Sequence, residues 1–221
     1  MNKDFNLVDM QDQYGETRLM KYVLADSVEG VKMAIKQGAS LNIQNKMGCT
    51  ALAIACIGGY TEIEKLLIQA GADVNIADKS GMTPLINACY KGNTTQIKRL
   101  IDAGADVNAV DCDNMSALTY AVKSNVLSAV EAILEAKPNL DTQDRYERTP
   151  LIWASTTNRT DIFQLLLEAG ASMDLCDEKG RNVLDYAIEM KNVTAVKLLH
   201  QHHPKMKAMV NQYLNDSKQN G

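Results

Sequence analysis

The sequence predicts an all-α solenoid of six 33-residue helix-turn-helix repeats, in which the first and last repeats are modified as caps. Three observations predict this fold. A leucine recurs at every thirty-third residue, a threonine or serine stands two residues before it in five cases, and an alanine follows three residues after it in five cases. The leucines are Leu19, Leu52, Leu85, Leu118, Leu151 and Leu184. A pattern that keeps its phase through six copies indicates a stack of equivalent units.

The phase also sets the boundaries of the repeats. Positions are counted below as offsets from the first residue of each repeat, and the repeats start at Asp12, Asn45, Asp78, Asp111, Asp144 and Asp177. We expect residues 1–11 to form an N-terminal extension, residues 12–210 one repeat domain, and residues 211–221 a C-terminal tail.

Each repeat is expected to contain a turn, a first helix and a second helix, in that order. In the third repeat, Thr83 can cap the first helix, and Pro84 follows in its first turn, where a missing N–H costs nothing. Ile97 and Leu100 lie at helical spacing in the second helix, which stops at Gly104. Two helices of about ten residues cannot bury their apolar faces alone, so stacking must supply the core.

The C-terminal end is expected to act as a polar cap. Val193, Val196 and Leu199 begin the last helix of the final repeat. Pro204 then opens a polar segment, and we expect an additional amphipathic helix over residues 205–214. This arrangement gives the end of a stack the solvated outer face that it needs.

The core of the pattern resembles the ankyrin repeat family. The family's T-P-L-H-x-A core appears as T-P-L-I-N-A at 83–88 and T-P-L-I-W-A at 149–154, and its Gly-Ala-Asp close appears at 71–73. The resemblance covers about residues 12 to 210. It implies an ankyrin-repeat solenoid that binds proteins through its turns, called fingers below, and through the inner face of its first helices, which together form a concave groove.

Two further expectations depend on the resemblance. The family's histidine at offset eight, which bridges neighbouring loops, is replaced in all six repeats by Met20, Ala53, Ile86, Thr119, Ile152 and Asp185. We therefore expect the bridging network to be absent. Asn75 and Asn108 match the place where animal members can be hydroxylated on asparagine, but a structural role in the loop is the favoured interpretation of both residues.

The fourth and fifth repeats depart most from the pattern. Glu147 stands where the turn favours glycine, and the fourth repeat closes with Lys137-Pro138-Asn139. Because a residue before proline avoids the helical region, Lys137 should leave the right-handed helix. We expect a distorted or mobile junction over residues 137–148, which reflects either tolerated drift or a contact with a partner.

Composition restricts the class of partner. The net charge of −4 and the pI near 5.4 give no general attraction to nucleic acid or to an anionic membrane. Residues 1–11 contain no apolar core behind basic residues, and no apolar run approaches 18 residues, so we expect a cytoplasmic protein, although secretion without a cleaved signal stays open. We expect no nucleic-acid or membrane partner.

The five cysteines do not form a metal or redox motif. Cys56 and Cys89 follow the conserved alanine directly and should be buried, whereas Cys49 and Cys112 lie in the turns and should be more exposed. His200, His202 and His203 gather in one terminal stretch, with no carboxylate or cysteine close enough in sequence to complete a site. We expect no metal and no cofactor.

Aromatic residues mark the candidate binding surface. At offset nine, consecutive repeats carry Tyr120, Trp153 and Tyr186, spaced by about 10 Å if adjacent helices pack at the usual distance. The rings either anchor a partner or fill space between first helices. The eleven residues that we predict to bind a partner protein are Met47, Lys79, Met82, Tyr90, Met115, Tyr120, Arg145, Tyr146, Arg148, Trp153 and Tyr186. A Trp153→Ala change is expected to remove partner binding with little loss of stability.

The sequence favours a non-catalytic protein-protein interaction module. It contains no G-x-S-x-G, no phosphate-binding glycine loop and no H-E-x-x-H, and its histidines all lie at one end. The expected role is that of an adaptor, an inhibitor or an immunity-type protein, monomeric unless the groove self-associates. The alternatives are a microbial effector that acts on a host protein and, from another class, an enzyme or small-molecule binder that uses the aromatic groove.

Overall fold

A computed structural model describes residues 7–157 and 159–202. In this part of the chain there are twelve α-helices, one short 3-10 helix and no β-strand. The chain divides into two compact units, residues 1–112 and 113–221, called the N-terminal half and the C-terminal half below. The predicted helix over 205–214, His203, Pro204 and the predicted tail 211–221 lie outside the described residues, as do residues 1–6 of the predicted extension.

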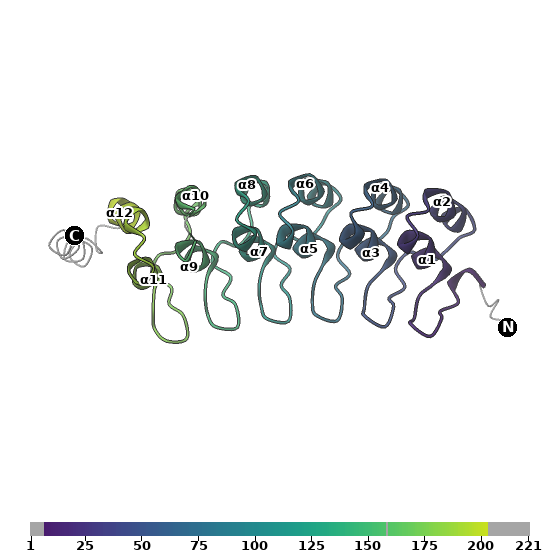
Figure 1. The fold of residues 1–221 in the computed structure, drawn as a ribbon, viewed down its shortest axis with the longest axis horizontal. Coiled ribbons are helices and arrows are strands. Elements are labelled where there is room, and N and C mark those ends of the chain that lie inside the picture. The colour runs from purple at the N-terminus through teal and green to yellow at the C-terminus, as the bar shows by residue number, and fades with distance from the viewer. Residues whose placement is uncertain (1–6, 158, 203–221) are drawn as a thin grey trace. The chain divides into compact units, whose positions relative to one another are not determined.

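The N-terminal half contains the 3-10 helix and three helix pairs. Its elements are η1 (Leu7–Asp9), α1 (Arg18–Leu24), α2 (Val28–Lys36), α3 (Ala51–Gly58), α4 (Thr61–Gln69), α5 (Pro84–Tyr90) and α6 (Thr94–Asp102). The first helices of the pairs, here called inner helices, pack side by side in the order α1, α3, α5. Each second or outer helix packs on its own inner helix, and the fingers extend from the inner layer (Figure 1).

The C-terminal half repeats this arrangement. Its elements are α7 (Ala117–Ser124), α8 (Leu127–Glu135), α9 (Pro150–Ser155), α10 (Thr160–Ala169), α11 (Val183–Glu189) and α12 (Val193–His202). The inner helices pack in the order α7, α9, α11, and the outer helices α8, α10 and α12 pack in the same order. The predicted all-α architecture of paired helices is therefore present in both halves.

The inner helices begin as the sequence predicts. The Thr83 hydroxyl accepts a hydrogen bond from the backbone N–H of Ile86 at 3.2 Å, and Pro84 occupies the first helical position. Thr149 and Pro150 make the same start for α9. Such a cap stabilises a helix by about 1 kcal/mol relative to alanine. The repeated Thr or Ser thus fixes where five of the inner helices leave their fingers, and Asn182 caps the sixth.

The fingers are joined by backbone hydrogen bonds within each half. Lys46 N donates to Tyr14 O at 3.0 Å, and Lys79 N donates to Met47 O at 3.1 Å. Gly48 turns the second finger with φ of +83°, and a Cβ at this position would lie 2.6 Å from the Lys79 N. Glycine is required there by both the left-handed backbone and the close approach of the next finger.

Neighbouring fingers are bridged although the histidines at offset eight are missing, because glutamines at another position make the bridges, which the sequence analysis did not predict. Gln44 Nε2 donates to Gly48 O at 2.6 Å and to Ala77 O, 33 residues further along the chain, at 2.9 Å. Gln11 and Gln143 make the same pair of bonds in their own repeats. The side-chain amide at the residue before each of these repeats spans two fingers. This position lies outside the motif that we used to define the bridge.

The irregular junction between the fourth and fifth repeats keeps the backbone path of the others. Lys137 and Glu147 are both left-handed, with φ of +54° and +60°. Lys137 N donates to Leu134 O at 3.0 Å, as a glycine would at this stop. Pro138 cannot donate the next hydrogen bond, which Ala105 N makes to Leu100 O at the equivalent place. The predicted distortion is therefore confined to two strained residues and one lost bond, and mobility there stays a prediction.

The burial of the cysteines follows the prediction, except that Cys49 is less exposed than Cys112. Cys56 and Cys89 are buried, and burial raises the pKa of both thiols well above the ordinary range. Cys112 is exposed, whereas Cys49 is half-buried with a pKa that burial also raises. The buried pair occupies the small space beside the conserved alanines, which is a packing role.

Candidate protein-binding surface

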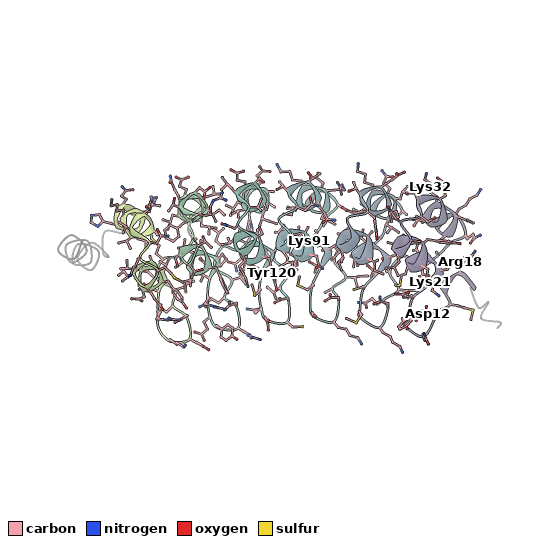
Figure 2. All side chains as sticks on the ribbon, in the orientation of Figure 1. Asp12, Arg18, Lys21, Lys32, Lys91 and Tyr120 are labelled. Atoms are coloured by element: carbon pink, nitrogen blue, oxygen red, sulfur yellow. The ribbon has the colours of Figure 1, made fainter. Side chains whose placement is uncertain are left out.

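The inner helices face the bases of their fingers. Lys21, at offset nine on α1, forms an ion pair with Asp12, at offset zero of its finger, with 2.9 Å between Nζ and Oδ2. Figure 2 labels both residues in the first repeat. In the fifth repeat the same two offsets are joined by a hydrogen bond from Trp153 Nε1 to Asp144 Oδ2 at 3.0 Å. Residues at offset nine, and at offset twelve one helical turn further, therefore share a surface with the fingers.

Asp144 organises the aromatic part of this surface in the C-terminal half. Its side chain is 1% exposed. Oδ1 accepts hydrogen bonds from the backbone N–H groups of Tyr146 and Arg148 at 2.9 and 3.0 Å. Oδ2 accepts from Trp153 Nε1 and from the Arg148 Nε at 3.1 Å. One buried carboxylate thus holds the finger turn, the guanidinium and the indole together.

The Arg148 guanidinium lies against two rings. Its central carbon is 4.0 Å from the Trp153 ring centroid and 4.7 Å from that of Tyr146. The Lys123 ammonium lies 4.3 Å from the Trp153 centroid, and Arg145 contacts Tyr146 while its Nη1 pairs with Asp113 at 2.8 Å. Cation-π contacts of this kind contribute about 0.5–2 kcal/mol each. We call this set of side chains the Arg148 cluster.

The same arrangement recurs one repeat later. Asp177 Oδ2 accepts hydrogen bonds from the Tyr186 hydroxyl at 2.8 Å and from Arg181 Nε and Nη2 at 3.1 and 2.9 Å. Burial alone would raise the pKa of Asp177, but the hydrogen bonds from Arg181 and Tyr186 outweigh it and lower the pKa to about 2. Burial and the bond to Asp177 raise the pKa of Tyr186. An acid at offset zero, an arginine at offset four and an aromatic residue at offset nine therefore stabilise the repeat, besides forming part of its surface.

The structure separates the predicted site residues of this half into surface and core. Tyr186 and Met115 are 8% and 7% exposed, so they support the surface from beneath. Tyr120, Trp153 and Arg148 are half-buried, and Arg145 and Tyr146 are exposed. The Arg148 cluster borders a shallow hollow of about 160 Å³ that is also lined by Met115 and Asp113. The hollow is small compared with the pockets of about 300–1,000 Å³ that hold small ligands.

The predicted residues of the N-terminal half are mostly open to solvent. Met47 is 70% exposed and Tyr90 is 62% exposed. Lys79 is exposed and Met82 is half-buried. Met47 and Lys79 lie on adjacent fingers that a backbone hydrogen bond joins, and Tyr90 is the last residue of α5.

The inner helices of the N-terminal half carry a row of apolar side chains at offset twelve, of which only Tyr90 was predicted from the sequence. Leu24 and Tyr90 are the last residues of α1 and α5, and Ile57 is the second-last residue of α3. Leu24, Ile57 and Tyr90 are 48%, 42% and 62% exposed. In the C-terminal half the same offset carries polar residues: Lys123, Thr156 and Glu189. The signal was available, because an apolar residue at offset twelve in three successive repeats lies one turn beyond offset nine on the same helix face.

The comparison with protein families identifies the class of this scaffold. A family model described as ankyrin repeats (3 copies) matches residues 2–78, 65–144 and 127–211. These matches cover almost the whole chain, which therefore belongs to the ankyrin repeat family. No curated protein sequence matches the chain. Ankyrin repeats are generally protein-protein interaction modules and are typically non-catalytic.

None of the described helices is a candidate for crossing a membrane. Over residues 7–157 and 159–202, no helix combines the length and the apolar character that crossing a bilayer requires.

Proposed function

We propose that this protein is a non-catalytic binding module that holds a partner protein against its fingers and inner helices, in the manner of an adaptor, an inhibitor or an immunity-type protein. The proposal extends to this chain the general role of ankyrin repeats as protein-protein interaction modules. It also specifies the surface, which is built from the exposed and half-buried members of the eleven predicted residues.

The Arg148 cluster is the observation that carries the proposal. Its Arg148 guanidinium is held by Asp144 and stacked between the rings of Tyr146 and Trp153. A side chain that is already ordered loses little freedom on binding, and immobilising a free one costs about 0.5–1.5 kcal/mol. Arginine, tyrosine and tryptophan are also the residues that most often carry the energy of protein interfaces.

The contacts of Trp153 change the choice of test variant. Replacing Trp153 with alanine removes the hydrogen bond to Asp144 and both stacked cations, so it is expected to reduce stability as well as binding. Arg145 is a cleaner probe, because its ion pair with Asp113 is exposed at both ends. Exposed pairs contribute about 0–1 kcal/mol.

Affinity capture from the source cells tests the proposal. Wild-type protein, Arg145→Glu, Tyr90→Ala and Lys197→Glu are immobilised, and captured proteins are quantified by mass spectrometry. Lys197→Glu is the matched control, because it makes the same charge change at an exposed position of outer helix α12. We expect at least one protein to be captured by the wild type and Lys197→Glu but lost from Arg145→Glu or Tyr90→Ala. Capture that all four proteins share equally would contradict the proposed surface.

A further inference from the structure

Leu24, Ile57 and Tyr90 are the large hydrophobic side chains that the described inner helices of the N-terminal half expose to solvent. The helices that carry these residues pack directly on one another, α1 on α3 and α3 on α5. Adjacent packed helices lie about 8–10 Å apart, so the row offers one apolar contact at intervals of about 10 Å. A row of exposed apolar side chains in this register gives a partner repeated contacts at a fixed interval.

Positive charges accompany the row. Lys46 and Lys79 occupy offset one of adjacent fingers and are exposed, and Lys91 follows Tyr90 directly. None of the three forms an ion pair within the part of the chain that the structure describes, and Lys91 Nζ donates to the carbonyl oxygen of Ile57 at the end of α3. Figure 2 labels Lys91, the residue that follows the last residue of α5. The other lysine of this face, Lys21, is neutralised by Asp12.

From the row and its charges we infer that the N-terminal half binds an amphipathic α-helix of a partner protein, with acidic residues flanking an apolar stripe. The inference rests on the proposed function and names the chemistry of the partner. Seven residues of an α-helix rise about 10.5 Å and return to nearly the same face, so side chains at i, i+7 and i+14 match the three contacts of the row. Acidic flanks complement Lys46, Lys79 and Lys91.

An extended strand does not match the row. Three residues of a strand cover about 10 Å, but because side chains alternate, the first and fourth point to opposite faces. A polyproline helix does return to the same face every three residues, at about 9.3 Å. Polyproline segments bind in grooves lined by aromatic rings, however, and only Tyr90 in the row is aromatic. The aliphatic Leu24 and Ile57 favour an α-helix.

Peptide binding to the full chain tests the inference. The probes are fluorescent peptides of about 21 residues, which span the row with one extra turn at each end. The first has leucine at every seventh position with glutamate flanks, the second has lysine in place of the glutamates, and the third is an acid-flanked Leu-Pro-Pro repeat. Fluorescence anisotropy gives the affinities. We expect the first peptide to bind at least about tenfold more tightly than either of the others.

Variants at equivalent offsets locate the site. Ile57→Glu, in the centre of the row, is expected to weaken binding of the acid-flanked peptide by about tenfold or more. The change removes an apolar contact and adds a negative charge that repels the glutamates of the peptide. Thr156→Glu is the matched control at the same offset of the C-terminal half and is expected to leave the affinity unchanged. Lys46→Glu/Lys79→Glu is expected to reverse the preference towards the lysine peptide. Circular dichroism confirms that each variant is folded.

The outcomes separate this inference from the proposed function. Equal binding of the acidic and basic peptides, tighter binding of the proline peptide, or equal effects of Ile57→Glu and Thr156→Glu would overturn the acidic-helix partner. If the peptides fail while Arg145→Glu or Tyr90→Ala still loses partners captured from cells, the binding module stands and only its partner class is wrong. If the capture experiment also shows no difference between variants, the proposed surface itself is wrong.

Discussion

Replacing Asp177 with asparagine separates the two roles of the carboxylate in the last repeat. Oδ1 accepts the backbone N–H groups of Lys179 and Arg181 at 2.9 and 2.8 Å, and Oδ2 receives Tyr186 and the Arg181 guanidinium. Asparagine can keep the first role, because Asn45 accepts the same two backbone bonds at the equivalent position. It loses the second, since a neutral amide cannot pair with the guanidinium.

The lowered pKa of Asp177 indicates how much unfolding free energy Asp177→Asn should lose and how that loss should depend on pH. The shift from an ordinary value of 3.8 to about 2 corresponds to about 2.4 kcal/mol of unfolding free energy. Asparagine keeps the backbone hydrogen bonds from Arg181 and Lys179 that cause part of this shift, and the Arg181 side chain is 35% exposed to screening by solvent, so we expect a loss of about 1–2 kcal/mol. A lowered acid pKa stabilises the fold fully above about pH 4, and the contribution is lost as the pH falls through 4 towards 2.

Urea denaturation followed by tryptophan fluorescence measures this difference in the correct half. Trp153 is the single tryptophan of the chain and lies in the C-terminal half with Asp177. Asp177→Asn is expected to lose about 1–2 kcal/mol at pH 7, and the gap to wild type is expected to close as the pH approaches 2. An equal stability at pH 7, or a gap that stays constant from pH 7 to pH 2, would refute the assignment of the lowered pKa to this carboxylate.

Three further predictions concern stability and reactivity. Glu147→Gly is expected to raise the unfolding free energy by about 1 kcal/mol in urea denaturation, because Glu147 holds a left-handed backbone with φ of +60°. Arg99→Leu is expected to cost about 3 kcal/mol in urea denaturation followed by circular dichroism, which also reports on the N-terminal half. The change leaves the buried Glu64 carboxylate without the guanidinium 2.7 Å away, and Glu64→Leu/Arg99→Leu should recover most of the loss. With a thiol reagent, exposed Cys112 is expected to react fastest, and Cys89 only after denaturation; rapid reaction of Cys89 in the folded protein would contradict its burial.

The elements that the sequence predicted are those with a local physical cause. Thr83 and Pro84 fix the start of α5 through one cap and one preset backbone angle, and the structure shows both. The glutamine bridging between fingers was not predicted, because it depends on where a side chain reaches in space. Gln44 spans two fingers only when a neighbouring repeat is stacked beside it, so its role follows from the fold rather than from its own segment.

The candidate surface was harder to predict because one offset can serve two purposes. At offset nine, Trp153 is half-buried while Tyr186 is buried with its hydroxyl on Asp177. The two aromatic residues look equivalent in the sequence. Their exposure depends on packing within the C-terminal half, which spacing alone does not specify.

The two halves present different chemistry at the same offsets, and this difference limits what each can contribute to recognition. In the C-terminal half, Arg148 and Arg181 are neutralised by carboxylates of the same chain, so a partner gains stacking area and ordered donors there but little net charge attraction. In the N-terminal half, Ile57 offers apolar area and Lys79 offers a charge that has no carboxylate partner among the described residues. Rim charges of that kind mainly raise the association rate and make it depend on salt. Raised salt should therefore lower the rate of association through the N-terminal half strongly, and change binding to the Arg148 cluster much less.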